Sequence, residues 1–270
     1  MHRLNIKSDA KPVKQQRRFH PDIREAIGIE VHKLIECGFI REEQHLGWVT
    51  NIVPVLKRNR KIKVCIDFRD LNAACPKDDF LLPITDVMID NMCGFEGMSF
   101  IDSFLGYNQI KIYSDDKKHT SLRTPLGVYC YTVMLFGLKN ADATYQRVMN
   151  TIFRDHLWKT VECYVDDITI KSSNKNNHLH DLRTIFNIMP AHQLKMNSTK
   201  SFLGVSSGKF LGFIITSKGI HLDPDKIKAI QDMQPPKTLK ELRCLQGKLA
   251  YIRRFITNLS GCQLFIRLMK

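Results

Sequence analysis

The sequence predicts an α+β fold in which helices back an antiparallel sheet. The middle of the chain has the pattern of a strand over residues 129–134, a helix over 145–153, a hairpin over 162–170 and a helix over 179–189. This order is typical of a sheet that has helices packed on one face. Hydrophobic residues make up 43% of the 270 positions, so the chain can bury a core of this kind.

The N-terminal part of the chain predicts an arm, a helix and a hairpin. Residues 1–24 are basic and polar, and we expect an extended arm outside the core. Apolar residues then recur at helical spacing over 23–37, and Gly38 fits the C-terminal cap of that helix. The β-rich residues 50–56 and the alternating residues 62–68 predict a hairpin. Its basic connection either contacts phosphate groups or is a solvated turn.

Two further segments precede the central elements. Residues 73–97 are rich in turn formers and are expected to be irregular. Residues 98–102 predict a buried strand that ends in Asp102. An aspartate at a strand end either caps a helix or offers a carboxylate to a metal ion. A glycine-containing loop is expected over 136–140, directly before the helix at 145–153.

The C-terminal part predicts a strand pair followed by two helices. Residues 209–215 give the strand pair, and a helix opens at Asp223 with a proline in its first turn. Pro235 and Pro236 end that helix. Thr238 and a glutamate three residues later have the capping-box pattern of the next helix.

The last predicted helix has an apolar side and a basic stripe. The stripe consists of Lys240, Arg243 and Arg254, and Gly247 lies among them. A basic stripe is usually only a solvated face. Glycine, however, costs roughly 1 kcal/mol inside a helix, which indicates close approach by a partner. A nucleic-acid backbone accounts for both features.

The composition narrows the class of protein. Lys and Arg outnumber Asp and Glu by 41 to 27, which predicts a polyanionic partner, nucleic acid foremost. The 8 cysteines form no C-x-x-C pair, so we expect reduced thiols in an intracellular protein of the cytoplasm, the nucleus or both. No apolar run is long enough to span a bilayer, and no membrane partner is expected.

Adjacent aspartates at the predicted hairpin tip are the strongest candidates for chemistry. Asp166 and Asp167 lie between two β-favouring runs. The chain has two other Asp-Asp pairs, at 78–79 and 115–116, which lie among polar residues and need only water. Like charges held together by a sheet are costly unless a cation is present. The hairpin pair is therefore the candidate cation site.

A third acid joins this pair if the two strands are neighbours. Asp102, Asp166 and Asp167 would then converge at one end of the sheet. Carboxylate oxygens suit Mg²⁺, and two such ions roughly 4 Å apart promote phosphoryl transfer. With a basic surface, this predicts a nucleotidyltransferase or a nuclease. Spacing alone does not choose between them.

A set of short motifs favours the nucleotidyltransferase over the nuclease. They occupy residues 38–41, 64–72, 74–78, 101–102, 106–110, 136–141, 164–167 (Tyr-Val-Asp-Asp) and 210–213. In this order they resemble the reverse transcriptase of gypsy-type (Metaviridae) LTR retrotransposons, particularly those of plants. The resemblance runs from residue 2 to about residue 256.

The resemblance implies a right-hand polymerase fold with fingers, palm and thumb. The expected division is a basic arm over 1–24, mainly fingers over 25–97, a palm with an interleaved fingers segment over 98–222, and a thumb over 223–270 that stops before any ribonuclease H region. The implied activity is RNA- or DNA-templated DNA synthesis with two Mg²⁺ ions, or Mn²⁺ in their place. The implied partners are an RNA template, a DNA primer, dNTPs and other products of the retroelement polyprotein.

The resemblance also assigns residues to roles. The catalytic metal ligands are Asp102, Asp166 and Asp167. The nucleotide-binding residues are Lys61, Lys63, Tyr107, Phe136 and Gly137, with the Tyr107 ring placed to clash with a ribose 2′-hydroxyl. The primer and template contacts are Tyr164, Leu211, Gly212, Lys240, Arg243, Gly247 and Arg254.

Three positions depart from the family pattern. Related elements usually have Gly at Arg60, Pro at Leu135 and a small residue at Asp142, which here could cap the following helix. These departures keep open a second hypothesis, a decayed and catalytically weak retroelement fragment that only binds nucleic acid.

Overall fold

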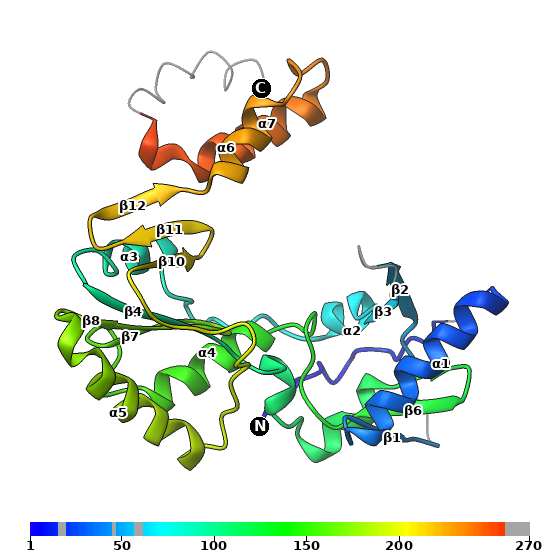
Figure 1. Ribbon diagram of the computed structural model, residues 1–270. Coiled ribbons are helices and arrows are strands. Elements are labelled where there is room, and N and C mark those ends of the chain that lie inside the picture. The colour runs from blue at the N-terminus through cyan, green and yellow to red at the C-terminus, as the bar shows by residue number, and fades with distance from the viewer. Residues whose placement is uncertain (16–19, 45–46, 57–61, 257–270) are drawn as a thin grey trace.

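The computed structural model describes residues 1–15, 20–44, 47–56 and 62–256. A four-stranded antiparallel sheet in the order β7-β8-β4-β9 lies at its centre (Figure 1). The strands are β4 (Gly97–Asp102), β7 (Val161–Tyr164), β8 (Asp167–Ser172) and β9 (Phe202–Val205). The predicted strand and hairpin are therefore confirmed as neighbours in one sheet.

Two helices pack on one face of this sheet. They are α4 (Ala141–Ile152), which contacts β7, and α5 (His178–Ala191), which contacts β8 (Figure 1). Tyr145 and Met149 lie on the apolar side of α4 and are buried. The predicted α+β arrangement is confirmed.

The opposite face of β4 carries a second core. Met88, Met98, Phe210 and Phe213 are buried together there. They connect β4 with α3 (Thr85–Asp90) and with the three-stranded sheet β10 (Ser207–Phe210), β11 (Phe213–Thr216) and β12 (Gly219–Leu222). The expectation that residues 73–97 are irregular was wrong for α3. Its six residues lack a side-chain cap and are too short to show a helical period.

A separate group of elements lies to one side of the central sheet (Figure 1). It contains the sheet β1 (Ile40–Glu42), β6 (Gly127–Tyr131), β5 (Leu122–Thr124), the hairpin β2 (Ile52–Leu56) and β3 (Ile62–Ile66), and the helices α1 (Pro21–Glu36) and α2 (Arg69–Ala74). Gly38 has φ +68°, and the amides of Gly38 and Phe39 bond the carbonyls of Ile35 and Leu34. This Schellman motif confirms the predicted end of α1.

The N-terminal segment is part of the core, which corrects the prediction of an external arm. His2 and Leu4 are buried. The His2 amide donates to Lys111, the Leu4 amide donates to Asp116, and the His2 ring bonds the Thr144 hydroxyl at 2.9 Å. The basic composition of residues 1–24 hid two alternating positions that face inward.

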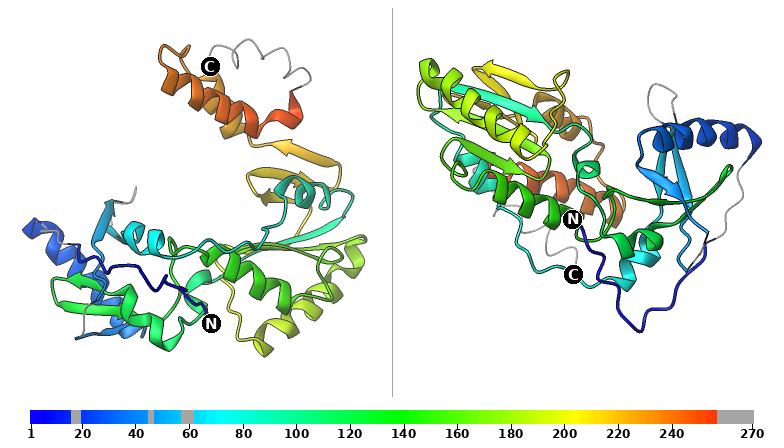
Figure 2. Two further views of the ribbon diagram at one scale, coloured as in Figure 1. Left: turned by 180° about the vertical axis from the view of Figure 1, so that it is seen from behind. Right: turned by 90° about the horizontal axis from the view of Figure 1, so that it is seen from below.

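The helices α6 (Pro224–Gln231) and α7 (Leu239–Tyr251) stand on the far side of the β10–β12 sheet (Figures 1 and 2). Asp223 caps α6, and the Thr238 capping box opens α7, as predicted. Four 3₁₀ segments complete the regular structure of the described chain: Gly106–Gln109, Ser114–Thr120, Lys175–Asn177 and Arg253–Phe255. The described cysteines are all unpaired. No helix in the described ranges is long and apolar enough to cross a membrane.

Candidate active site

Strand register brings the three predicted acids together. Asp102 is the last residue of β4 and lies directly opposite Asp167, the first residue of β8. Strands β7 and β8 pair Tyr164 with Asp167, so Val165 and Asp166 form a two-residue turn. Asp166 in the turn, Asp167 at the start of β8 and Asp102 at the end of β4 therefore lie at the same edge of the sheet.

The turn that presents Asp166 is strained and is held from behind. Val165 has φ +53°, a left-handed conformation in which glycine is usual and a β-branched residue is rare. The buried Gln146 of α4 accepts the Val165 amide at 2.7 Å and donates to the Cys163 carbonyl at 2.8 Å. These two bonds fix the backbone on both sides of the turn. Strain of this kind persists only where the surroundings enforce it.

The carboxylates repel one another. Desolvation, followed by the charges of Asp166 and Asp102, raises the pKa of Asp167 to about 6. Desolvation also raises the pKa of Asp166, and the charges of Asp102 and Asp142 add to it. Such shifts, from burial and like charges together, are typical of functional sites.

Little positive charge offsets these acids. Lys200 Nζ lies 3.7 Å from Asp102 Oδ2, and Asn197 donates to the same oxygen at 3.3 Å. Among the described residues, neither Asp166 nor Asp167 has an ion-pair partner. A hollow of about 200 Å³ lies beside Asp102 and Asp167, and Lys200 and Lys209 contribute to its wall.

The acids fit a divalent cation that brings further ligands with it. Within the described chain, no group of three or more His, Cys, Asp or Glu side chains forms a metal site by itself. Mg²⁺ in proteins is commonly held by one or two carboxylates, with water and substrate phosphates completing its shell. Two uncompensated carboxylates on a rigid turn, with a third opposite them, match that requirement.

Tyr107 lies next to the acids on the 3₁₀ segment Gly106–Gln109. A side chain at Gly106 would approach Asp166 Cβ to 3.2 Å, so glycine allows this segment to pack against the turn. The Tyr107 ring contacts the rings of Phe136 at 5.9 Å and Tyr145 at 5.5 Å between centroids. Its hydroxyl donates to Asp142 Oδ1 at 2.6 Å. The alternative that Asp142 caps α4 was wrong, because α4 has no side-chain cap.

The loop that carries Phe136 and Gly137 is anchored to α2. Asn72 donates to the Gly137 carbonyl at 2.7 Å and accepts the Lys139 amide at 2.7 Å. Lys139 Nζ bonds the Asn72 carbonyl as well. Phe136 itself is 77% exposed, so the loop presents an aromatic face toward solvent beside Tyr107.

A second strained turn joins β10 to β11. Leu211 and Gly212 have φ +48° and +85°, the signs of a type I′ turn. Tyr251, the last residue of α7, stacks on Phe213 with 4.9 Å between centroids. A side chain at Gly212 would overlap the Tyr251 hydroxyl, so only glycine allows this contact.

A family model described as "Reverse transcriptase (RNA-dependent DNA polymerase)" matches residues 55–215. The chain belongs to the reverse transcriptase family. It is 29% identical over 241 residues to the retrovirus-related Pol polyprotein from transposon opus and 34% identical over 233 residues to that from transposon 297, both of Drosophila melanogaster. It also resembles the gypsy polyprotein of that organism at 29% identity. These matches cover 85–88% of this chain but 22–24% of the relatives, so the chain spans about a quarter of their length.

Solved reverse transcriptases share the fold. The foamy viral protease-reverse transcriptase in complex with RNA/DNA hybrid matches all of this chain with a TM-score of 0.85 at 24% identity, over 36% of its own length. A second form, in complex with double-stranded DNA, matches with a TM-score of 0.88, also at 24% identity, over 48% of its length. The predicted right-hand polymerase fold is confirmed.

Within this reverse transcriptase fold, most predicted site residues are placed but not all come together. Lys61 and Arg60 lie outside the described residues, and Lys63 is placed by its backbone in β3. Tyr164 ends β7 directly beside the acid turn. On α7, Lys240 and Arg243 are exposed, and the space beside Gly247 is open.

Arg254 does not belong to the basic stripe, contrary to the prediction. Helix α7 ends at Tyr251, and Arg254 lies in the following 3₁₀ segment. Its guanidinium pairs with Asp90 of α3. The helical period therefore fails beyond the end of α7, and this arginine joins the helix pair to the rest of the chain.

The structure adds site residues that the sequence did not reveal, namely Gln146, Asn72 and Tyr251. Each acts on a backbone segment distant in sequence, so no local pattern marks it. The only available signal was weak: Gln146 interrupts the apolar side of α4.

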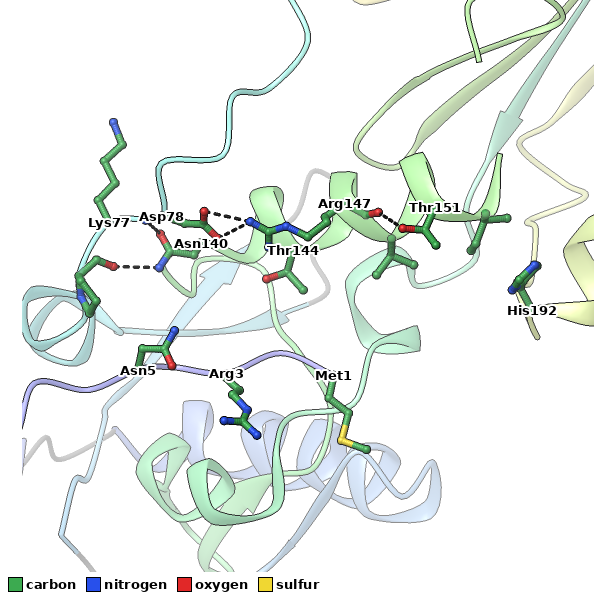
Figure 3. Close-up of a pocket in the computed structure, with 13 residues that line it drawn as sticks. Met1, Arg3, Asn5, Lys77, Asp78, Asn140, Thr144, Arg147, Thr151 and His192 are labelled. Carbon is green, nitrogen blue, oxygen red and sulfur yellow. Dashed lines mark hydrogen bonds and ion pairs between the residues drawn. The ribbon is translucent and has the colours of Figure 1, made fainter. Parts of the chain in front are cut away.

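A larger cavity of about 800 Å³ lies away from the acids. It is lined by Thr144 and Arg147 of α4 and by the N-terminal residues Met1 and Arg3, and the Arg147 side chain reaches toward Asp78 (Figure 3). There, one guanidinium nitrogen of Arg147, Nη2, donates to both carboxylate oxygens of Asp78. The acid turn therefore does not open into this cavity.

Proposed function

We propose that this chain is an RNA- and DNA-templated DNA polymerase that transfers nucleotides from dNTPs to a primer 3′-hydroxyl. The observation that carries the proposal is the convergence of Asp102, Asp166 and Asp167 with little compensating positive charge. A protein that held these charges for stability alone would pair them. Family membership supports the same reaction class.

The three acids would hold two Mg²⁺ ions, or Mn²⁺ in their place. When bound, such ions would lower the pKa of the attacking hydroxyl and stabilise the negative charge on the leaving oxygen. Asp102 and Asp166 would carry most of the coordination. Lys200, 3.7 Å from Asp102, is close enough to give a proton or a charge to a leaving pyrophosphate.

The surrounding residues would orient the substrates. Tyr107 and the loop at Phe136 and Gly137 would receive the dNTP, with Lys61 and Lys63 near its phosphates. The turn at Leu211 and Gly212, with Tyr164, would position the primer end.

Further out, the exposed Lys240 and Arg243 flank the open surface at Gly247 and would follow the template–primer backbone. The structural neighbours' complexes with RNA/DNA hybrid and double-stranded DNA support such partners. The division into fingers, palm and thumb at residues 97 and 222, partnership with other polyprotein products, and an intracellular location belong to this proposal.

The alternative of a decayed, binding-only fragment is not favoured. Both departures from the family pattern that the structure describes are accommodated. Leu135 packs against the main core, and Asp142 accepts the Tyr107 hydroxyl.

The proposal is tested by primer extension on an RNA template with dNTPs and Mg²⁺. Extension is expected and should stop with chelator. Asp166→Asn should lower the rate by roughly 10³-fold or more, because it removes a carboxylate that several kcal/mol of metal catalysis depends on. Template–primer binding should be nearly unchanged.

A matched control exists in Asp115→Asn, which changes an exposed member of another Asp-Asp pair and should extend normally. Equal extension by Asp166→Asn and the parent would refute the metal-site assignment. Salt-sensitive duplex binding without any extension by the parent would instead support the binding-only alternative.

A further inference from the structure

A fourth carboxylate, Asp142, lies beside the three proposed metal ligands. It occupies the first turn of α4 and is exposed. Its charge contributes to the raised pKa of Asp166, so the two groups share one electrostatic neighbourhood. The proposed two-metal reaction gives Asp142 no role.

The contact that Asp142 makes is specific. Its Oδ1 atom accepts the Tyr107 hydroxyl at 2.6 Å, and in the described chain this is the hydroxyl's hydrogen-bond partner. A bond to an ionised acceptor is shorter and stronger than a neutral one. Asp142 also lies in the first turn of α4, where the positive end of the helix dipole suits an acidic side chain.

The other contacts of Tyr107 are apolar, because its ring packs against the main core and against two aromatic rings. Phe136 and Tyr145 touch the ring through aromatic edges and faces. Phe136 is itself largely exposed, so it gives little lateral support. The bond to Asp142 is thus the polar contact that fixes where the ring edge lies.

We propose that Asp142 is a positioning residue for sugar selection, which holds the Tyr107 ring against the sugar of the incoming nucleotide. This inference rests on the proposed polymerase function. Two effects follow from the one bond. The ring cannot swing away from a ribose 2′-hydroxyl, and the phenol, whose proton is committed to Asp142, cannot donate a hydrogen bond to that hydroxyl.

The test measures nucleotide preference on the full chain bound to a DNA primer and an RNA template. Single incorporation of dGTP and of GTP opposite cytidine gives a ratio of kcat/KM values. Asp142→Ala should lower the preference for dGTP roughly tenfold, the scale of one lost hydrogen bond to a charged group. The loss of preference in Asp142→Ala should come from a lower KM for GTP. The kcat for dGTP should stay as in the parent.

Four variants separate positioning from general damage. Asp142→Asn keeps an acceptor oxygen and should restore most of the preference. Tyr107→Phe removes the donor and should match Asp142→Ala, and the double variant should lose no more than either alone. Asp155→Ala, which removes an exposed acid just beyond α4, should behave as the parent.

The inference is overturned if Asp142→Ala leaves the ratio unchanged, if Asp142→Asn behaves like Asp142→Ala, or if the two single losses add in the double variant. Nucleotide affinity on a dideoxy-terminated primer separates this inference from the polymerase proposal. A parent that binds dGTP over GTP without incorporating either refutes the polymerase activity, and the affinity ratio of Asp142→Ala then decides the inference. A parent that binds neither nucleotide refutes both.

Discussion

The two ends of the β7–β8 hairpin treat carboxylates in opposite ways. At the open end, Glu162 and Lys171 are both almost fully buried and pair at 2.8 Å. Lys171 also bonds the Asn91 carbonyl at 2.7 Å and lies over the Phe95 ring. At the turn, Asp166 and Asp167 have no cationic partner among the described residues.

This difference separates charge used for structure from charge kept for a ligand. Burial raises the pKa of Glu162, and Lys171 opposes that shift within the protein. At the turn, no described cation offsets the repulsion between the Asp166 and Asp167 carboxylates. A cation that binds from solution would therefore be attracted by both of them.

The other aspartate pairs support this distinction, although the prediction that they need only water was wrong. Asp78 pairs with Arg147 at 2.9 Å, and Asp116 accepts the Leu4 amide at 2.9 Å.

The largest expected effect comes from breaking the buried pair. Lys171→Met leaves Glu162 buried without a counter-charge and should lower the free energy of unfolding by about 3–5 kcal/mol. Urea denaturation measures this loss. Lys175→Met, at an exposed lysine, is the matched control. Adding Glu162→Leu to Lys171→Met should recover most of the stability, and a Lys171→Met variant as stable as the parent would contradict the comparison.

A smaller effect is expected where the turn is held from behind. Gln146→Ala leaves the Val165 amide and the Cys163 carbonyl without their partner and should cost about 1–3 kcal/mol of stability. It should also slow nucleotide incorporation, because Asp166 follows Val165 directly. Gln146→Glu keeps the acceptor for Val165 and should lose less on both measures. Unchanged stability and rate in the alanine variant would show that the turn holds its shape alone.

The smallest expected effect is a gain in folding stability, whereas the two preceding changes lower it. Because the pKa of Asp167 is raised to about 6 in the folded chain, the folded state binds the proton more tightly than the unfolded state. In metal-free buffer, stability should therefore fall as pH rises from about 4 to above 6. Asp167→Asn should remove this loss and gain up to about 1 kcal/mol at neutral pH, since solvent screens the exposed group.

Denaturation across that pH range, with Asp115→Asn as the unaffected control, checks the sign. A variant less stable than the parent at neutral pH without metal would overturn the claim that the turn stores repulsion. With Mg²⁺ added, the order should reverse, because only the parent retains the full set of ligands.

The sequence predicted the elements whose signals are local. The Asp166 hairpin, the Thr238 capping box and the Gly38 helix end all appear where expected. Neighbouring strands then placed Asp102 opposite Asp167 without further information.

The failures share a physical origin in distant contacts. His2 is buried because it meets Thr144, 142 residues away, and Gln146 matters because a turn 19 residues later needs its amide. Helix α3 contributes Met88 to the second core, which it shares with Met98 and Phe213 from other parts of the chain. A local sequence pattern does not indicate such distant partners. Residues 1–24 were therefore predicted from their composition to be an arm, and residues 73–97 to be irregular.

The stacking of Tyr251 on Phe213 gives α7 a mechanical role. Tyr251 lies at one end of the helix, and its ring and hydroxyl lie over the turn at Leu211 and Gly212. A helix of 13 residues is about 20 Å long, so a 2 Å movement at its far end turns it by about 6°. Helix α7 thus has the geometry of a lever, with its C-terminal ring lying against the turn. If a duplex binds along α7 as proposed, a movement of the helix would reach the turn at Leu211 and Gly212 as a displacement rather than as a chemical signal.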